Sequence, residues 1–174
     1  MTDKTVKINP KRLSGEISIP PSKSMSHRAI IAASLSSGIS KVSNVILSKD
    51  IIATIEAMKN FGIDFEISDE DNTRKTLIIT GNENLKYSGL PIDCNESGST
   101  LRFLIPFATL LENEVTYIGK GKLIERPLDA YYEIFDKNNI SYQTTNNKLP
   151  LKVNGRLKGG DFYLRGDVSS QFIT

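Results

Sequence analysis

An internal repeat constrains the fold of this chain more than any other feature of its sequence. From residue 16 the pattern predicts the order strand, helix, strand, helix, strand, strand, and the same order begins again at residue 84. A βαβ crossover requires both strands in one sheet with the helix packed against it. The repeat therefore predicts a mixed α/β (α+β) fold built from quasi-symmetric βαβαββ units. The offsets between equivalent positions agree: 74 residues from Arg28 to Arg102 and from Gly81 to Gly155, and 77 from Ile63 to Ile140.

The repeat divides the chain into two complete units and the start of a third, at about 16–83, 84–156 and 157–174. In the first unit we expect strands at 16–20, 41–46, 64–68 and 75–80 and helices at 24–37 and 50–62. In the second we expect strands at 90–95, 114–119, 140–145 and 149–155 and helices at 97–112 and 126–139. The third unit begins with a strand at 160–166 and stops as a helix begins at 168–174. We therefore interpret the chain as a fragment of a longer protein, with residues 1–15 as a separate N-terminal segment.

The composition limits the class of protein. The 174 residues are enough to bury a hydrophobic core, and 22 basic against 20 acidic residues leave a net charge of +2. So balanced a charge gives no support for binding nucleic acid or a membrane surface. No stretch approaches the roughly 18 uninterrupted apolar residues of a membrane span, and the single cysteine, Cys94, cannot form an internal disulfide. We expect a cytoplasmic protein with a buried thiol at Cys94.

Three serine-rich motifs stand at equivalent helix starts: PSKSMSHR at 21–28, NESGSTLR at 95–102 and GDVSSQF at 166–172. A helix N-terminus carries unpaired N–H groups and a partial positive charge, so it attracts phosphate or carboxylate. Hydroxyls add donors, and Lys23, Arg28 and Arg102 add full charges. A serine at a helix start is usually only a cap, but three starts in register favour a site for a small substrate with several negative groups.

Together with ERPLDA at 125–130, these motifs resemble the EPSP synthase (3-phosphoshikimate 1-carboxyvinyltransferase) family. The resemblance runs from Ile17 to Thr174 and corresponds to the N-terminal portion of a longer family. It implies two lobes, each of three βαβαββ units, with residues 16–174 forming part of the first lobe. Residues 1–15 would belong with the second lobe.

The resemblance also implies an activity. Family members transfer the enolpyruvyl group of phosphoenolpyruvate to the 5-hydroxyl of shikimate 3-phosphate and release phosphate, in the shikimate pathway that leads to chorismate and the aromatic amino acids. No cofactor or metal is implied, the complete protein would be a monomer, and glyphosate would be a possible inhibitor. The carboxylates that move protons in this family lie in the second lobe, so we expect the chain alone to be inactive.

Particular residues match the family's substrate-binding positions. Lys23 matches the residue that contacts both substrates, and Gln171 matches another that reaches both. The remaining matches for shikimate 3-phosphate are Ser24, Arg28, Ser169 and Ser170. The matches for phosphoenolpyruvate are Gly98 and Arg126, and Arg102 is expected to support the glycine turn.

Two residues depart from the family pattern. Glu96 places a negative charge beside the expected anion site, where it would pair with Arg102 or Lys23. Pro106 lies inside an expected helix, which it should kink. Either difference could alter tolerance to glyphosate. The single histidine, His27, is expected on the helix surface rather than as a general base.

Two alternative functions remain open at this stage. The chain could belong to an enolpyruvyl transferase acting on UDP-N-acetylglucosamine, although the Ser-x-Ser-x-x-Arg set of the first motif favours a sugar-ring phosphate instead. It could also be a non-catalytic module that binds a phosphorylated metabolite, although the incomplete third unit argues against this. Binding of shikimate 3-phosphate or of a UDP-sugar would discriminate among these hypotheses.

Overall fold

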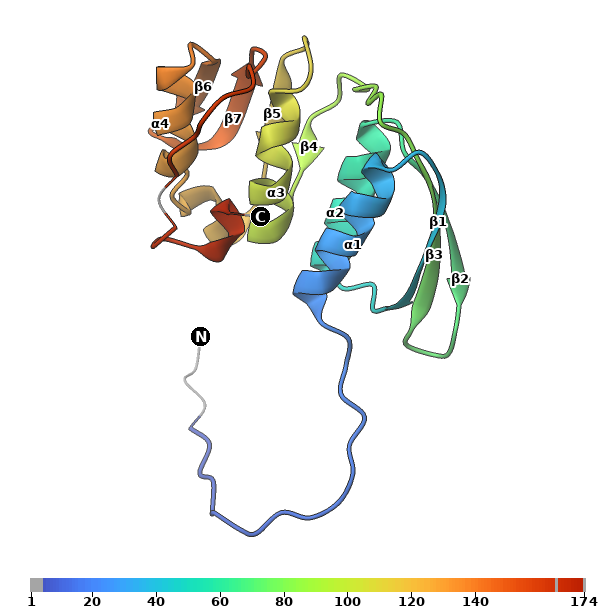
Figure 1. The fold of residues 1–174 in the computed structure, drawn as a ribbon. Helices are drawn as coiled ribbons and strands as arrows, with labels where there is room; N and C mark the ends of the chain where they lie inside the picture. Colours follow the sequence, from blue (N-terminus) through green and yellow to red (C-terminus); the bar gives the residue numbers. More distant parts are fainter. Residues whose placement is uncertain (1–4, 165, 174) are drawn as a thin grey trace.

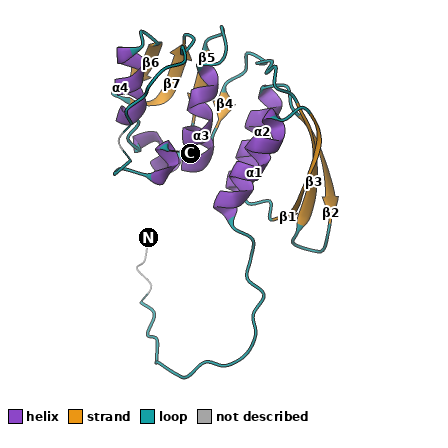
Figure 2. Ribbon diagram, in the orientation of Figure 1, coloured by secondary structure: helices purple, strands orange, loops and turns teal. Residues whose placement is uncertain are grey.

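The computed structural model describes residues 5–164 and 166–173 and shows a layered α/β arrangement (Figure 1). A three-stranded sheet contains β1 (Gly38–Val45), β3 (Lys75–Gly81) and β2 (Asp64–Asp69), in that order, with antiparallel neighbours. Helices α1 (Lys23–Leu35) and α2 (Lys49–Asn60) pack against this sheet on one face, as the view coloured by secondary structure shows (Figure 2).

The second sheet has the order β4-β5-β7-β6. Its strands are β4 (Ile92–Asp93), β5 (Val115–Ile118), β7 (Lys148–Asn154) and β6 (Ser141–Thr145). Strand β4 is parallel to β5, whereas the other pairs are antiparallel. Helices α3 (Gly98–Ala108) and α4 (Asp129–Lys137) pack against this sheet, and the short 3-10 helix η1 (Gly121–Glu125) connects β5 to α4.

The two sheets share an arrangement that agrees with the repeat in the sequence. The order β5-β7-β6, with its two antiparallel pairings, matches β1-β3-β2 in strand order and direction. In both, two helices alternate with the strands in the same sequence order. The third unit stays a prediction, since its described part contains only the 3-10 turn η2 (Ser170–Phe172).

Serine side chains cap the helices that the repeat predicts. Ser22, Ser48 and Ser97 precede α1, α2 and α3, and each hydroxyl accepts a hydrogen bond from the main-chain N–H three residues later. Such a cap satisfies one of the donors that a helix start leaves unpaired. The three helices also pack against one another.

Pro106 lies inside α3 and removes one helical hydrogen bond. The acceptor that loses its donor is the main-chain carbonyl of Arg102, four residues earlier. The Tyr131 hydroxyl of α4 donates to that carbonyl at 2.5 Å. The side chain of Tyr131 thus replaces the missing main-chain donor and ties α4 to α3. The predicted kink itself stays a prediction.

Two predicted strands are wrong. Residues 16–20 are extended but form no strand, and Ile17 and Ile19 are 86% and 79% exposed. A strand needs a hydrogen-bonded neighbour, and no described segment pairs with this one. The predicted strand at 160–166 is also absent at 160–164 and 166, while residue 165 lies outside the described residues.

Two helices are shorter than predicted. Helix α3 ends at Ala108, before the predicted limit at residue 112. The main-chain N–H groups of residues 109–111 donate to carbonyls three residues earlier, so the helical pattern is not continued. The predicted helix at 168–174 is a 3-10 turn over Ser170–Phe172 in its described part; residue 174 lies outside that part. No helix in the described ranges is long and apolar enough to cross a membrane.

Candidate active site

The start of α1 carries three of the predicted ligands, Lys23, Ser24 and Arg28. Lys23 Nζ lies 2.5 Å from Asp50 Oδ2, at the start of α2, and its side chain remains 57% exposed. Arg28 Nη1 donates to the Ser24 main-chain oxygen at 3.1 Å and also to the Ser24 hydroxyl. The spacing of four residues places Ser24 and Arg28 on the same face of the helix. This part of α1 therefore presents a cation and a hydroxyl together, while Lys23 is turned toward Asp50 of α2.

A groove of about 430 Å³ lies between α1, α3 and η2. Arg28 and Gln171 both line it, so the first and third motifs border a common space. The Arg28 guanidinium also lies over the Phe103 ring, 4.9 Å from its centroid. Such a cation–π contact holds the guanidinium against α3. The cavity beside β2 is lined by none of the predicted ligands.

Gly98 at the start of α3 lies against Arg126, which follows η1. A β-carbon built on Gly98 would lie 2.6 Å from Arg126 Nη1, closer than van der Waals contact permits. Any larger residue here would displace the guanidinium. The structure thus brings together the two residues that sequence predicts for phosphoenolpyruvate.

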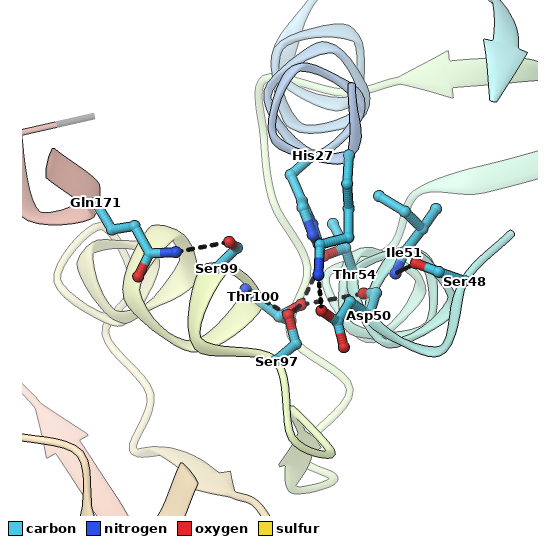
Figure 3. Close-up of polar contacts among 10 residues, drawn as sticks. His27, Ser48, Asp50, Ile51, Thr54, Ser97, Ser99, Thr100 and Gln171 are labelled. Carbon is cyan, nitrogen blue, oxygen red and sulfur yellow. Dashed lines mark hydrogen bonds and ion pairs between the residues drawn. The ribbon is translucent and has the colours of Figure 1, made fainter. Parts of the chain in front are cut away.

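The third motif reaches the same helix start through Gln171. Gln171 Nε2 donates to Ser99 Oγ at 2.8 Å (Figure 3), and Gln171 Oε1 accepts from Arg102 Nη1 at 2.7 Å. The Arg102 guanidinium also lies 4.9 Å from the Phe172 ring centroid, and its Nη2 donates to a main-chain carbonyl. Arg102 therefore supports the third motif from a position only 6% exposed, and its expected support of the glycine turn stays a prediction.

Electrostatics at Arg102 follow from this burial. Burial lowers the pKa of the guanidinium, and the nearby positive charge of Arg126 adds to the effect. Two guanidiniums near one helix start raise the local positive potential, which an anionic ligand would relieve. In the third motif, Ser169 Oγ accepts from the Gln171 main-chain N–H at 3.2 Å, and Ser170 is exposed.

His27 is buried, which corrects the expectation of a surface position. Its side chain is 0% exposed, and Nδ1 lies 2.7 Å from the Thr54 hydroxyl of α2 (Figure 3). A lone histidine is more often exposed, but helices α2 and α3 close over this face of α1. Burial lowers the pKa of His27 from its ordinary 6.5 to about 4, so the ring is neutral near pH 7.

Glu96 does not form the ion pairs that the sequence suggested. Among the described residues, Lys23 pairs with Asp50 and Arg102 bonds to Gln171, while Glu96 lies against Gly121. Gly121 has φ of +55°, and a side chain there would clash with the Glu96 carboxylate. The negative charge is thereby held away from both cations.

The Cys94 thiol is buried, as predicted, and burial raises its pKa, which keeps it protonated and unreactive. Within the ranges 5–164 and 166–173 no group of three or more His, Cys, Asp or Glu side chains could hold a metal ion.

Sequence reasoning missed four polar residues that organise this site. Asp50 neutralises Lys23, and Thr54, Ser97 and Thr100 form a buried chain of hydroxyls between α2 and α3. The available signal was a polar residue on the apolar face of each predicted helix. Threonines at 54 and 100 stand among isoleucines and leucines, where an unpaired hydroxyl would be costly.

The fold matches that of solved EPSP synthases. The structure superimposes on that of EPSP synthase from Acinetobacter baumannii with a TM-score of 0.74, covering 91% of this chain and 37% of that chain at 24% identity. At that identity the likeness concerns the fold, so the class of protein is an α/β chain with the architecture of this group of transferases.

Sequence comparison defines the family. The family model for EPSP synthase (3-phosphoshikimate 1-carboxyvinyltransferase) matches residues 8–174, so the chain belongs to the EPSP synthase family. Relatives named 3-phosphoshikimate 1-carboxyvinyltransferase include those of Clostridium novyi (strain NT), 55% identical over 97% of this chain, and Clostridium kluyveri, 53% identical over 98%. The chain spans 40% and 39% of their respective lengths.

Proposed function

We propose that the complete protein transfers the enolpyruvyl group of phosphoenolpyruvate to the 5-hydroxyl of shikimate 3-phosphate. The products would be 5-enolpyruvylshikimate 3-phosphate and phosphate. One observation carries the proposal: the three serine-rich motifs lie around one end of packed helices, with Arg28 and Gln171 on a common groove and Arg126 against Gly98. Membership of the family supports the same reaction.

This chain would supply the shikimate 3-phosphate half-site and part of the phosphoenolpyruvate site. Lys23 and Arg28 would balance the phosphate charge of the sugar ring. The hydroxyl ligands proposed for that phosphate are Ser24, Ser169 and Ser170. Lys23 is suited to contact both substrates because its exposed ammonium can leave Asp50 for a stronger anion.

For phosphoenolpyruvate we propose Gly98, Arg126 and Gln171, with Lys23 shared. The planar guanidinium of Arg126 can bind a phosphate or carboxylate through two parallel hydrogen bonds. Gly98 leaves room for it, because even a methyl group would meet Arg126 Nη1. Gln171 already exchanges hydrogen bonds with Arg102 and Ser99, so its amide is oriented before substrate arrives.

The chain alone is expected to make no product, because none of its carboxylates matches the family's proton-transfer groups. We infer that residues 16–174 belong to one lobe and that residues 1–15 belong with another. A chromatographic assay of the purified chain with both substrates tests this. Any 5-enolpyruvylshikimate 3-phosphate above a protein-free control would contradict it.

We also infer that glyphosate, an analogue of phosphoenolpyruvate, competes at the Gly98–Arg126 side of the site. The Glu96 carboxylate lies against Gly121 and away from the cations, so its charge should affect this competition little. Glyphosate inhibition of the complete enzyme should therefore be the same for Glu96→Ala as for the unaltered protein. A shift of more than about threefold would show that the carboxylate reaches the site.

Calorimetric titration of the chain tests the assignment of substrate. Shikimate 3-phosphate should bind, UDP-N-acetylglucosamine should not, and Arg28→Gln should weaken the binding at least about tenfold, as expected for loss of a charged hydrogen bond. Arg74→Gln is the matched control, because Arg74 pairs with Asp71 in a distant hairpin. Binding of the UDP-sugar instead would favour the alternative transferase.

A further inference from the structure

His27 is joined to α2 and to the start of α3 by a continuous chain of short hydrogen bonds. Its Nδ1 lies 2.7 Å from Thr54 Oγ1, and Thr54 Oγ1 lies 2.7 Å from Thr100 Oγ1. Thr100 Oγ1 in turn donates to Ser97 Oγ at 2.7 Å (Figure 3). All four side chains are buried, and the chain of contacts crosses from α1 through α2 to α3.

The direction of these hydrogen bonds follows from the number of hydrogens. A threonine hydroxyl has one hydrogen to donate, and Thr100 directs its own to Ser97 Oγ at 2.7 Å and to the Asp50 main-chain oxygen at 3.3 Å. The contact between Thr54 and Thr100 then requires Thr54 as donor, which leaves Thr54 only as an acceptor toward His27. The proton of the neutral imidazole must therefore lie on Nδ1.

The remaining ring nitrogen agrees with this assignment. His27 Nε2 is buried and has no hydrogen-bond partner among the described residues. With the proton on Nδ1, this nitrogen carries only a lone pair. The other tautomer would bury an N–H donor without an acceptor, which is rarer in proteins than an unsatisfied acceptor.

We propose that His27 is a positioning residue of the substrate site. Its Nδ1–H is the first donor in the hydrogen-bond chain His27–Thr54–Thr100–Ser97, which we call the relay. This proposal rests on the proposed function. Ser97 caps α3 by accepting from the Thr100 main-chain N–H at 3.1 Å, and Gly98 follows it against Arg126. The relay thus fixes the cations of α1 relative to the glycine turn of α3.

Protonation of His27 would add an N–H donor at Nε2, which is buried and has no acceptor among the described residues. The charged groups that face His27 are Asp50 from α2, and Lys23 and Arg28 from its own helix. Burial outweighs the attraction of Asp50 and lowers the pKa of His27, and both cations act in the same direction. The ring therefore stays neutral near pH 7.

The tautomer can be measured without any ligand, because His27 is the only histidine of the chain. A long-range proton–nitrogen correlation spectrum at pH 7 should show a protonated Nδ1 and an unprotonated Nε2. Thr54→Val removes the acceptor and should abolish that tautomer preference, whereas the exposed control Thr145→Val should preserve it. A protonated Nε2 in the unaltered chain would overturn the relay.

Binding then tests the positioning role. His27→Asn keeps a polar donor near the place of Nδ1 and should bind shikimate 3-phosphate within about twofold of the unaltered chain. His27→Leu and Thr54→Val should each bind roughly five- to tenfold more weakly, as loss of one buried hydrogen bond predicts. Equal affinity of all the variants would overturn the role.

The two levels of the proposal can fail separately. If the unaltered chain binds no shikimate 3-phosphate, the proposed function fails and the positioning role fails with it, although the relay would still be seen in the tautomer. If the ligand binds and the tautomer is Nε2–H, the relay fails and the proposed function stands. Circular dichroism identifies any variant that does not fold, and Thr54→Val keeps the test available if His27→Leu is such a variant.

Discussion

Acid should destabilise this chain through His27, and replacing that residue by asparagine should remove the effect. The imidazole is 0% exposed and held by the Thr54 hydroxyl. Its pKa is lowered from 6.5 to about 4, chiefly by burial, with Lys23 and Arg28 contributing in the same direction and Asp50 opposing them. Asparagine can keep a hydrogen bond to Thr54 but cannot take up a proton.

The magnitude follows from the two pKa values. Below pH 6.5 the unfolded chain binds a proton at His27, while the folded chain binds it only near pH 4. Because the unfolded state then holds more protons, stability is fully present above pH 6.5 and is lost as the pH falls from there toward 4. The whole interval corresponds to roughly 3 kcal/mol, of which about 2 kcal/mol is lost between pH 7 and pH 5.

Urea unfolding at pH 7 and pH 5 measures the difference. The unaltered chain should lose about 2 kcal/mol more than His27→Asn over this interval. Glu70 and Asp71 also have lowered pKa values, through hydrogen bonds from Thr76 and from the main chain of Thr73 respectively, but they are common to both proteins and cancel. An equal loss in the two proteins would refute a buried, neutral His27.

Three further changes test the helix starts and their supports. Gly98→Ala should alter the free energy of unfolding by less than about 0.5 kcal/mol, because the exposed Arg126 guanidinium can move aside. The same change should weaken phosphoenolpyruvate binding measured by calorimetry, and unchanged binding would contradict the assignment of Gly98. Arg102→Met should increase the amide hydrogen exchange of residues 169–173, because it removes the Arg102 contacts with Gln171 and Phe172. Exchange equal to that of the unaltered chain would argue against this supporting role of Arg102. Tyr131→Phe should lower the free energy of unfolding in urea by about 1–2 kcal/mol, since the Arg102 main-chain carbonyl loses its donor. Tyr163→Phe, at an 88% exposed residue, should be neutral. Equal effects of the two changes would be inconsistent with a stabilising hydrogen bond from Tyr131.

Local pattern predicted most of the helices and strands, because their signals lie within each segment. The strands β2 and β3 and the helix α2 fall within two residues of their predicted limits. The strand expected at 16–20 failed because strand formation depends on a partner, which an apolar alternation cannot provide by itself. The burial of His27 likewise depends on α2 and α3, so its own neighbours in sequence carried no sign of it.

The candidate site shows the same division between local and tertiary information. Ser24 and Arg28 could be placed together from their four-residue spacing. The approach of Arg126 to Gly98 follows from the path of η1 and could be expected only through family resemblance. Asp50, which pairs with Lys23 across 27 positions of sequence, was not foreseen at all.

The most direct test of the central claim is a map of where shikimate 3-phosphate contacts the chain. Main-chain amide shifts followed by NMR during titration should change at residues 22–28 and 169–171, the two motifs proposed to hold the sugar phosphate. The start of α3 at 97–102 should respond more weakly, through the bonds of Gln171 to Arg102 and Ser99. Changes confined to the cavity beside β2, lined by Gly62 and Thr80, or no change at all, would contradict the account.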